Sequence, residues 1–232
     1  MKIAVIRVAL LAVWCLCAHL PMPGAGWADQ AVVGPGSGAV TRAKFAGMAD
    51  MGVKQAFNKL QNPEFLSNDS FMQEAVRVSF GHRRRQAMDL ACNYLRLPRE
   101  EHVEGKSFTR EMDFHVAKSV LQAFPEEGLA RLRALYASTR DAVTRGNVVL
   151  ALGGMGSDPR ALQLLLNALE EKEFYGGSDS DAVGYPMRVC DLAYNQIVAQ
   201  YEIRGVLRTI GSGHRISVRD DHIQRLRQLA PQ

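Results

Sequence analysis

The sequence predicts an all-helical fold built from short, stacked helix pairs. Apolar residues recur at helical spacing, and no long window alternates apolar and polar residues in the manner of a strand. Amphipathic segments of similar length also follow one another, separated by glycine, proline and aspartate. A two-helix unit cannot bury its apolar face alone, so such units stack and share a core. We therefore expect a helical-repeat protein, a class that works mostly by presenting a surface.

The first 28 residues are typical of a secretory signal peptide. Lys2 and Arg7 give a basic start, Val8–Leu20 is an almost unbroken apolar run, and Gly26 and Ala28 are the small residues that precede a cleavage site. An apolar run of this length spans roughly 20 Å as a helix, less than the bilayer core of about 30 Å. An uncleaved membrane anchor is the alternative. We predict cleavage after Ala28 and a periplasmic or secreted protein.

Cleavage would change both the charge and the cysteine count. It would remove two of the 28 basic residues and none of the 24 acidic ones, which lowers the net charge from +4 to +2. A nucleic-acid partner is not expected, because such binding needs a clustered basic face. Cys92 and Cys190 would remain, each inside an apolar helical segment. We expect buried free thiols, with a disulfide as the alternative.

One helical domain, 51–232, is expected to follow a flexible leader at 29–50, whose glycine, proline and serine content is typical of poorly ordered chain. Prolines, glycines and capping residues mark the expected helix ends. Helices are expected at 53–60, 68–80, 82–97 and 113–124, from 125, at 139–152, from 159, and at 186–201 and 220–229. The charged stretch 99–110 contains a glycine and is expected to be a loop.

The segment 139–171 is the clearest repeat, and 186–229 is the second. In the first repeat an inner helix, apolar on nearly every side, ends at Gly153, Gly154 and Gly156. Glycine reaches the left-handed conformation of a helix C-terminus at little cost, so we expect it to be used there. Asp158 is expected to cap the next helix, with Pro159 at its first position.

A family resemblance rests on this repeat. The residues that carry it are Thr144-Arg145, Leu152-Gly153, Asp158-Pro159 and Ala161. They resemble HEAT-like repeats of the phycobilisome-lyase type, in which Arg opens the inner helix, Leu-Gly closes it and Asp-Pro opens the outer helix. Around Asp191 the match is partial. This chain departs by one extra residue in the corner and by Gly146 in place of a helix former.

The resemblance implies an armadillo-like, right-handed α-α superhelical solenoid. It also implies structural roles for Arg145, Asp158, Pro159 and Asp191 at helix termini and between neighbouring repeats, with ordinary solvated charges as the alternative for Arg145 and Asp158. It does not carry a lyase activity.

Two features are candidates for partner binding. The segment 173–186 is long for a helical stack and carries Phe174, Tyr175 and Tyr185 at its edges, where aromatic side chains supply contact area. A disordered insertion is the alternative. The basic run Arg83, Arg84 and Arg85 could contact phosphate or anionic lipid. A solvated helix face is favoured there, since acidic residues follow and no aromatic residues interleave.

The sequence contains no recognisable catalytic or metal-binding motif. The histidines lack ligand spacing, Asp179-Ser180-Asp181 lacks the rest of a calcium loop, and no nucleophile elbow, phosphate-binding loop or C-x-x-C occurs. We expect no cofactor. The favoured function is a non-catalytic protein-interaction module or scaffold of the cell envelope, with an unidentified protein partner. The alternative is an enzyme or cofactor-handling protein with a site on the concave face.

Overall fold

The computed structural model describes residues 45, 47–103, 106–155, 158–175, 185–201 and 203–229, with the backbone alone for 100–109. They belong to one compact unit that begins at Phe45. The expected signal peptide and most of the expected leader lie outside the described residues. Phe45 and Met48 are fully buried, so the unit begins before residue 51, where the sequence placed its boundary.

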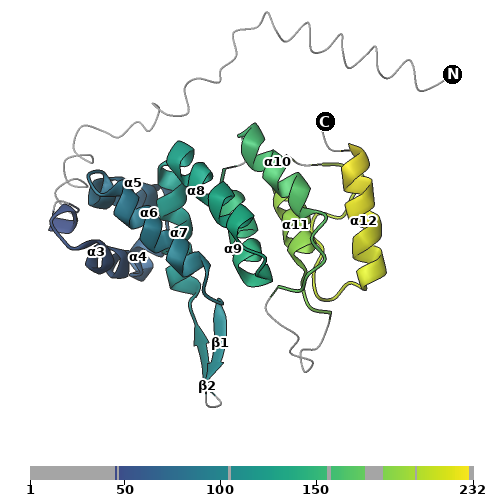
Figure 1. The fold of residues 1–232 in the computed structure, drawn as a ribbon, viewed down its shortest axis with the longest axis horizontal. Coiled ribbons are helices and arrows are strands. Elements are labelled where there is room, and N and C mark those ends of the chain that lie inside the picture. The colour runs from purple at the N-terminus through teal and green to yellow at the C-terminus, as the bar shows by residue number, and fades with distance from the viewer. Residues whose placement is uncertain are drawn as a thin grey trace, which may run out of the picture. The chain divides into compact units, whose positions relative to one another are not determined.

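Helices build almost all of this unit (Figure 1). They are α3 (Val53–Leu60), α4 (Pro63–Leu66), α5 (Asp69–Phe80), α6 (Arg84–Leu95), α7 (Glu111–Ala123), α8 (Pro125–Ser138), α9 (Ala142–Leu152), α10 (Pro159–Ala168), α11 (Val189–Tyr201) and α12 (Ile216–Leu229). The expectation of a helical fold is confirmed at this level.

Several helix starts follow from local capping chemistry, as expected. Asn68 precedes α5, and its side-chain oxygen accepts a hydrogen bond from the backbone N–H of Phe71 at 3.0 Å. Helix α8 begins at Pro125. The N–H groups of a first helical turn have no acceptor within the helix, and proline has no backbone N–H, so it is well suited to this position. Asp158 caps α10 by accepting from the N–H of Arg160 at 2.8 Å.

The stretch 99–110 is a β-hairpin, so the expectation of a loop was wrong. Strand β1 (Glu100–Val103) pairs antiparallel with β2 (Lys106–Thr109), with Glu100 opposite Thr109 and Val103 opposite Lys106. The N–H of Arg110 also donates to the Arg99 carbonyl at 2.7 Å, which extends the pairing. Strands of four residues are too short to produce a clear alternating pattern. Consequently α7 begins at Glu111 rather than at a cap formed by Asp113.

Two later helix starts also differ from the prediction. Helix α11 begins at Val189 rather than Pro186, because the residues before it pair with the chain that follows α10. Helix α12 begins at Ile216 rather than Asp220. In its added first turn Val218 is exposed and Arg219 is buried, so the turn does not follow the apolar periodicity expected of a helix.

The helices share one continuous apolar core. Helix α7 packs against α5, α6 and α8, and α8 contacts α9. Helix α11 packs against α9, α10 and α12, whereas α7 and α9 contact the largest number of other helices. Elements close in sequence are thus mostly neighbours in space (Figure 1).

Two glycines are required by close approach. A Cβ on Gly128 would overlap the backbone carbonyl of Leu121, so glycine lets α8 meet α7 closely. A Cβ on Gly146 would overlap the ring of Tyr175. The left-handed conformation expected at Gly153 was wrong, because its φ is −56° and its ψ is −19°. Gly156 lies outside the described residues.

Candidate functional site

The chain between α10 and α11 is paired at its base. The N–H of Tyr175 donates to the Met187 carbonyl at 2.8 Å, and the N–H of Val189 donates to the Glu173 carbonyl at 3.1 Å. Phe174 and Arg188 form an antiparallel bridge between these two bonds. We call residues 173–175 and 185–188 the stem. Residues 176–184 lie outside the described residues.

The first half of the stem is fixed to α9. The Tyr175 hydroxyl donates to the Oδ1 atom of Asn147 at 2.7 Å, and its ring covers Gly146. Asn147 is fully buried and donates in turn to the carbonyls of Leu95 and Leu97, at 2.9 and 3.1 Å. One amide side chain therefore joins the stem, α9 and the end of α6.

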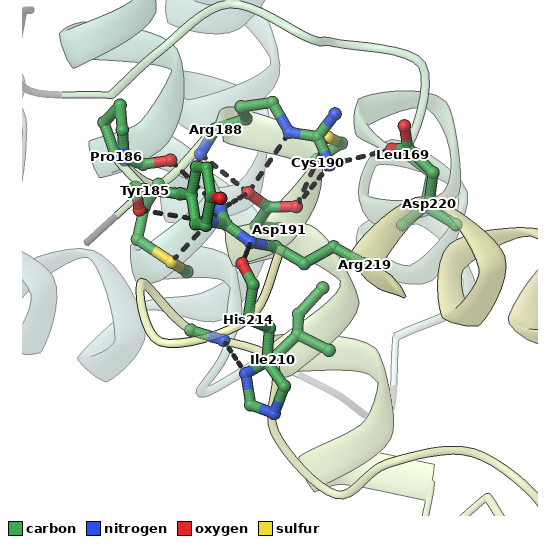
Figure 2. A network of polar contacts seen from close by, with 12 residues as sticks. Leu169, Tyr185, Pro186, Arg188, Cys190, Asp191, Ile210, His214, Arg219 and Asp220 are labelled. Carbon is green, nitrogen blue, oxygen red and sulfur yellow. Dashed lines mark hydrogen bonds and ion pairs between the residues drawn. The ribbon is translucent and has the colours of Figure 1, made fainter. Parts of the chain in front are cut away.

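The second half of the stem is fixed by a buried ionic network (Figure 2). The Asp191 carboxylate accepts from Arg219 Nη1 at 2.6 Å, from Arg188 Nη2 at 2.9 Å and from the Arg188 backbone N–H at 2.9 Å. Arg219 also donates to the carbonyls of Tyr185 and Pro186, at 2.9 and 3.0 Å. These contacts join α11, α12 and the stem.

The charges of this network balance. Arg188 makes a second ion pair with Asp220 at 2.8 Å, so two guanidinium groups face two carboxylates. Burial opposes the charge of Asp191, but hydrogen bonds from Arg188 and Arg219 outweigh it and hold the pKa of that carboxyl below its usual value. Every charge in this network has an internal partner, which indicates a structural role.

The two cysteines are free thiols, Cys190 buried and Cys92 partly buried. Burial and the nearby Asp191 carboxylate raise the pKa of the Cys190 thiol to about 12, so it stays protonated at neutral pH. Cys190 therefore packs as a small apolar side chain, the state favoured by the sequence.

The predicted aromatic residues of the 173–186 segment divide into two kinds. The side chains of Phe174 and Tyr185 are each 43% exposed, although both residues belong to the fixed stem. The N–H of Tyr185 also donates to the Ser212 carbonyl at 2.9 Å. Tyr175, by contrast, is bound to Asn147 and serves as an anchor. Phe174 and Tyr185 are thus the candidate contact residues of this region.

The predicted repeat residues lie at helix ends. Arg145 Nε donates to the carbonyl of Thr139, at the C-terminus of α8, at 2.9 Å, and Arg145 also binds the Glu171 carboxylate beyond α10. Its guanidinium lies 5.0 Å from the centre of the Tyr136 ring. Arg145 therefore joins three successive helical segments, α8, α9 and the end of α10.

Asp158 and Pro159 open α10, and Arg160 connects that turn to α8. Arg160 Nη2 binds Asp158 at 2.6 Å and Glu126 at 2.9 Å. Hydrogen bonds from Arg160 lower the pKa of Asp158 to about 2. The cap is thus also part of an interhelical ion pair.

The basic run before α6 makes mostly internal contacts. The Arg83 guanidinium donates to the carbonyls of Ala49, Met51 and Ser79, so it is not available to a partner. Arg84 pairs with Glu127 at 3.4 Å. Arg85 is exposed. Binding of a partner by this run stays a prediction that now rests mainly on Arg85.

Sequence reasoning missed Arg188, Arg219 and Asn147. Arg188 and Asp191 stand three residues apart at a helix start, a spacing that brings two such side chains together. Nothing in the sequence marks Arg219, since α12 is rich in arginine and its other arginines are exposed. Asn147 lies among valines and leucines, and a polar residue inside an apolar helix was a signal for a buried hydrogen bond.

A cavity of about 490 Å³ opens where the C-terminus of α7 meets the first turns of α8 and α10. Gln122, Glu126 and Asp158 supply its polar lining, and both carboxylates are bound to Arg160. A smaller cavity of about 160 Å³ lies beside it, between α8 and α10. Neither brings a nucleophile to an oriented base.

Within the part of the chain that the structure describes, no group of three or more His, Cys, Asp and Glu side chains is arranged to hold a metal ion. No helix of that part is long and apolar enough to cross a bilayer. Comparison with protein-family models, with curated proteins and with solved structures finds no match in any of the three.

Proposed function

We propose that this chain is an exported, non-catalytic protein-interaction module of the cell envelope. Its binding surface is the stem, with Phe174 and Tyr185 as the contact residues. The observation that carries this proposal is that two large aromatic side chains remain 43% exposed on a backbone held from both sides.

A fixed backbone matters because binding loses less conformational entropy when the contact residues are already ordered. Aromatic side chains dominate the energy of many interfaces, since each buries a large area with few rotatable bonds. The stem combines both properties. The charged groups beneath it are paired internally, which favours a supporting role for them over chemistry.

We also propose that the helices form a right-handed, HEAT-like solenoid. The support is that neighbours in sequence are mostly neighbours in space, and that Arg145 binds the ends of two flanking helical segments. In a stack of this kind, a long connection leaves the core undisturbed and adds contact surface on one rim.

The test is capture of binding proteins from envelope extract by the wild-type protein and by the double variant Phe174→Ala/Tyr185→Ala. The double variant is expected to lose at least tenfold in recovery of the proteins that wild type enriches, as for a hot spot. Met112→Ala is the matched control, because Met112 is 50% exposed and lies on α7. Thermal melts of all three proteins establish that the fold is intact.

Equal recovery by wild type and the double variant would contradict the proposed surface. N-terminal sequencing of the protein from the envelope fraction tests export separately. We expect a chain that starts at Asp29, and an intact Met1 would rule out cleavage.

A further inference from the structure

A second surface lies at the C-terminal end of the described chain. The connection from α11 to α12 is held to α11 by the Tyr194 hydroxyl, which donates to the Leu207 carbonyl at 2.6 Å. Asn195 Nδ2 also donates to the Ile210 carbonyl at 2.8 Å. On the other side, the Leu207 N–H donates to His222 Nδ1 at 3.3 Å. The connection therefore lies against α12 in a fixed position.

Three large apolar side chains stay exposed here. Val218 and Leu229 lie on the same side of α12 as His222, since residues four and seven apart share one helix face. Leu207 is the residue bound to His222, and the three apolar side chains are between 36% and 53% exposed. Leu229 lies beside Gly205, at which an added Cβ would be 3.9 Å from Leu229 Cδ1.

Three exposed arginines surround these apolar side chains. Arg204 and Arg208 flank Leu207 in the connection, and Arg225 lies between His222 and Leu229 on α12. None of the three forms an ion pair with a residue that the structure describes. Several other arginines of that part do, including Arg84, Arg99, Arg131, Arg145, Arg160 and Arg227. We call Arg204, Leu207, Arg208, Val218, Arg225 and Leu229 the C-terminal patch.

We propose that the C-terminal patch docks this protein peripherally on an anionic phospholipid surface. The guanidinium groups would bind lipid phosphates, for which their planar set of N–H donors is well suited. The leucine and valine side chains would enter the boundary between headgroups and acyl chains. The proposal does not depend on the proposed role of the stem.

Charge and shape together favour a bilayer over an acidic peptide. Exposed apolar and cationic side chains contributed by α12 and the adjoining connection match a partner with phosphates above hydrocarbon. A bound peptide needs pockets for its side chains, and neither of the two cavities described above reaches this patch. Among the described elements, α12 makes its main contacts with α11, so none of them covers its outer side to any large extent.

The test is co-sedimentation of the full chain with vesicles of phosphatidylcholine alone, or with about one third phosphatidylglycerol to give an anionic surface. The patch variant is Arg204→Gln/Arg208→Gln/Arg225→Gln. Its control is Arg77→Gln/Arg133→Gln/Arg140→Gln, three exposed arginines that also lack an ion pair with any described residue. The two variants carry the same net charge and keep the apolar N-terminal segment. The increase in binding from neutral to anionic vesicles, compared between the two variants, therefore measures the contribution of the patch.

Wild type and the control variant should bind anionic vesicles in a salt-sensitive way. The patch variant should lose about a hundredfold in that gain, since each guanidinium contributes roughly a factor of five near an anionic bilayer. Leu207→Ser/Leu229→Ser should lose about tenfold through reduced insertion of apolar area.

Three outcomes would overturn the proposal. Wild type could show no preference for anionic vesicles, or the two triple variants could lose binding equally. In the third outcome, wild type would bind polyglutamate through the patch and would not bind the vesicles. That result would assign the patch to an acidic protein partner.

Discussion

Different kinds of contact stabilise the N-terminal end and the C-terminal end of the helical unit. At the N-terminal end, aromatic rings pack against one another, with Phe45 and Phe71 at 4.9 Å and Phe65 and Phe71 at 5.3 Å between ring centres. At the C-terminal end, α12 buries two apolar side chains, Ile223 and Leu226, together with the whole of Arg219. Apolar burial is strong but non-directional, whereas an arginine with several fixed acceptors also sets an orientation.

This difference is explained by what each end must position. The N-terminal helices rely mainly on their shared apolar core, to which Arg83 adds hydrogen bonds to the carbonyls of Ala49, Met51 and Ser79. Helix α12 and the stem must be held at a defined place, and Arg219 achieves this by binding α11 and two stem carbonyls at once. Buried ion pairs add little net stability compared with apolar packing of the same volume, but the loss of one partner is costly.

The largest expected effect comes from breaking the ionic end. Asp191→Asn removes one of the two carboxylates that balance two buried guanidinium groups, so we expect a loss of about 3–5 kcal/mol in the free energy of unfolding. Urea unfolding measures this loss. Hydrogen exchange should further show faster exchange in α12 and the stem than in α5 and α7.

Asp89→Asn is the matched control, because Asp89 pairs with Arg131 at 2.9 Å on the surface. Such pairs contribute about 0–1 kcal/mol. Similar losses for the two variants would mean that the buried network has no special role.

A smaller effect is expected between the two ends, at Arg145. Arg145→Ala removes charge-assisted hydrogen bonds to Thr139 and Glu171, and we expect a loss of about 2 kcal/mol in urea unfolding. Arg133→Ala, an exposed change on α8, should stay within about 0.5 kcal/mol of wild type. If the two variants unfold at the same urea concentration, Arg145 does not join the helical segments energetically.

Gly146 tests how closely the stem must approach α9. In Gly146→Ala, displacement of the Tyr175 ring should lower the free energy of unfolding by about 1–3 kcal/mol. The better helix propensity of alanine should offset roughly 1 kcal/mol of that loss. The net loss should accompany a changed environment of Tyr175, measured by near-ultraviolet circular dichroism. Gly47→Ala is the control, because nothing lies within 4 Å of a Cβ added there. That variant should be as stable as wild type or more so.

The smallest expected effect is a dependence on pH at the ionic end. The folded-state pKa of Asp191 is lowered, so its stabilisation is complete above the unfolded value of about 4 and is lost as pH falls through the folded value. The urea midpoint of wild type should therefore fall more steeply below pH 4 than that of Asp191→Asn. The slope should not vanish in the variant, because Glu111 also has a pKa lowered by its hydrogen bond from Arg99. Parallel acid profiles would exclude Asp191 as a source of the pH dependence.

The candidate site was only partly visible in the sequence. The position and length of the 173–186 segment pointed to Phe174, Tyr175 and Tyr185, but not to the anchoring of Tyr175 on Asn147. Asp191 was expected to bind a helix terminus. Its partner Arg219 lies 28 residues later in a polar helix, where local pattern could not distinguish it from exposed arginines. Gly146 departs from the repeat pattern in the sequence. Glycine is needed there because the ring of Tyr175, from another segment, lies against it.

The sequence by itself determined the helices, because apolar periodicity and capping residues such as Asn68, Pro125 and Asp158 act within a few residues of chain. Only the tertiary structure decided which polar side chains are buried together, which strands pair at 100–109, and which apolar residues stay exposed on α12. Those outcomes depend on contacts between distant segments. The burial of a charge or an amide is favourable only once every partner is in place.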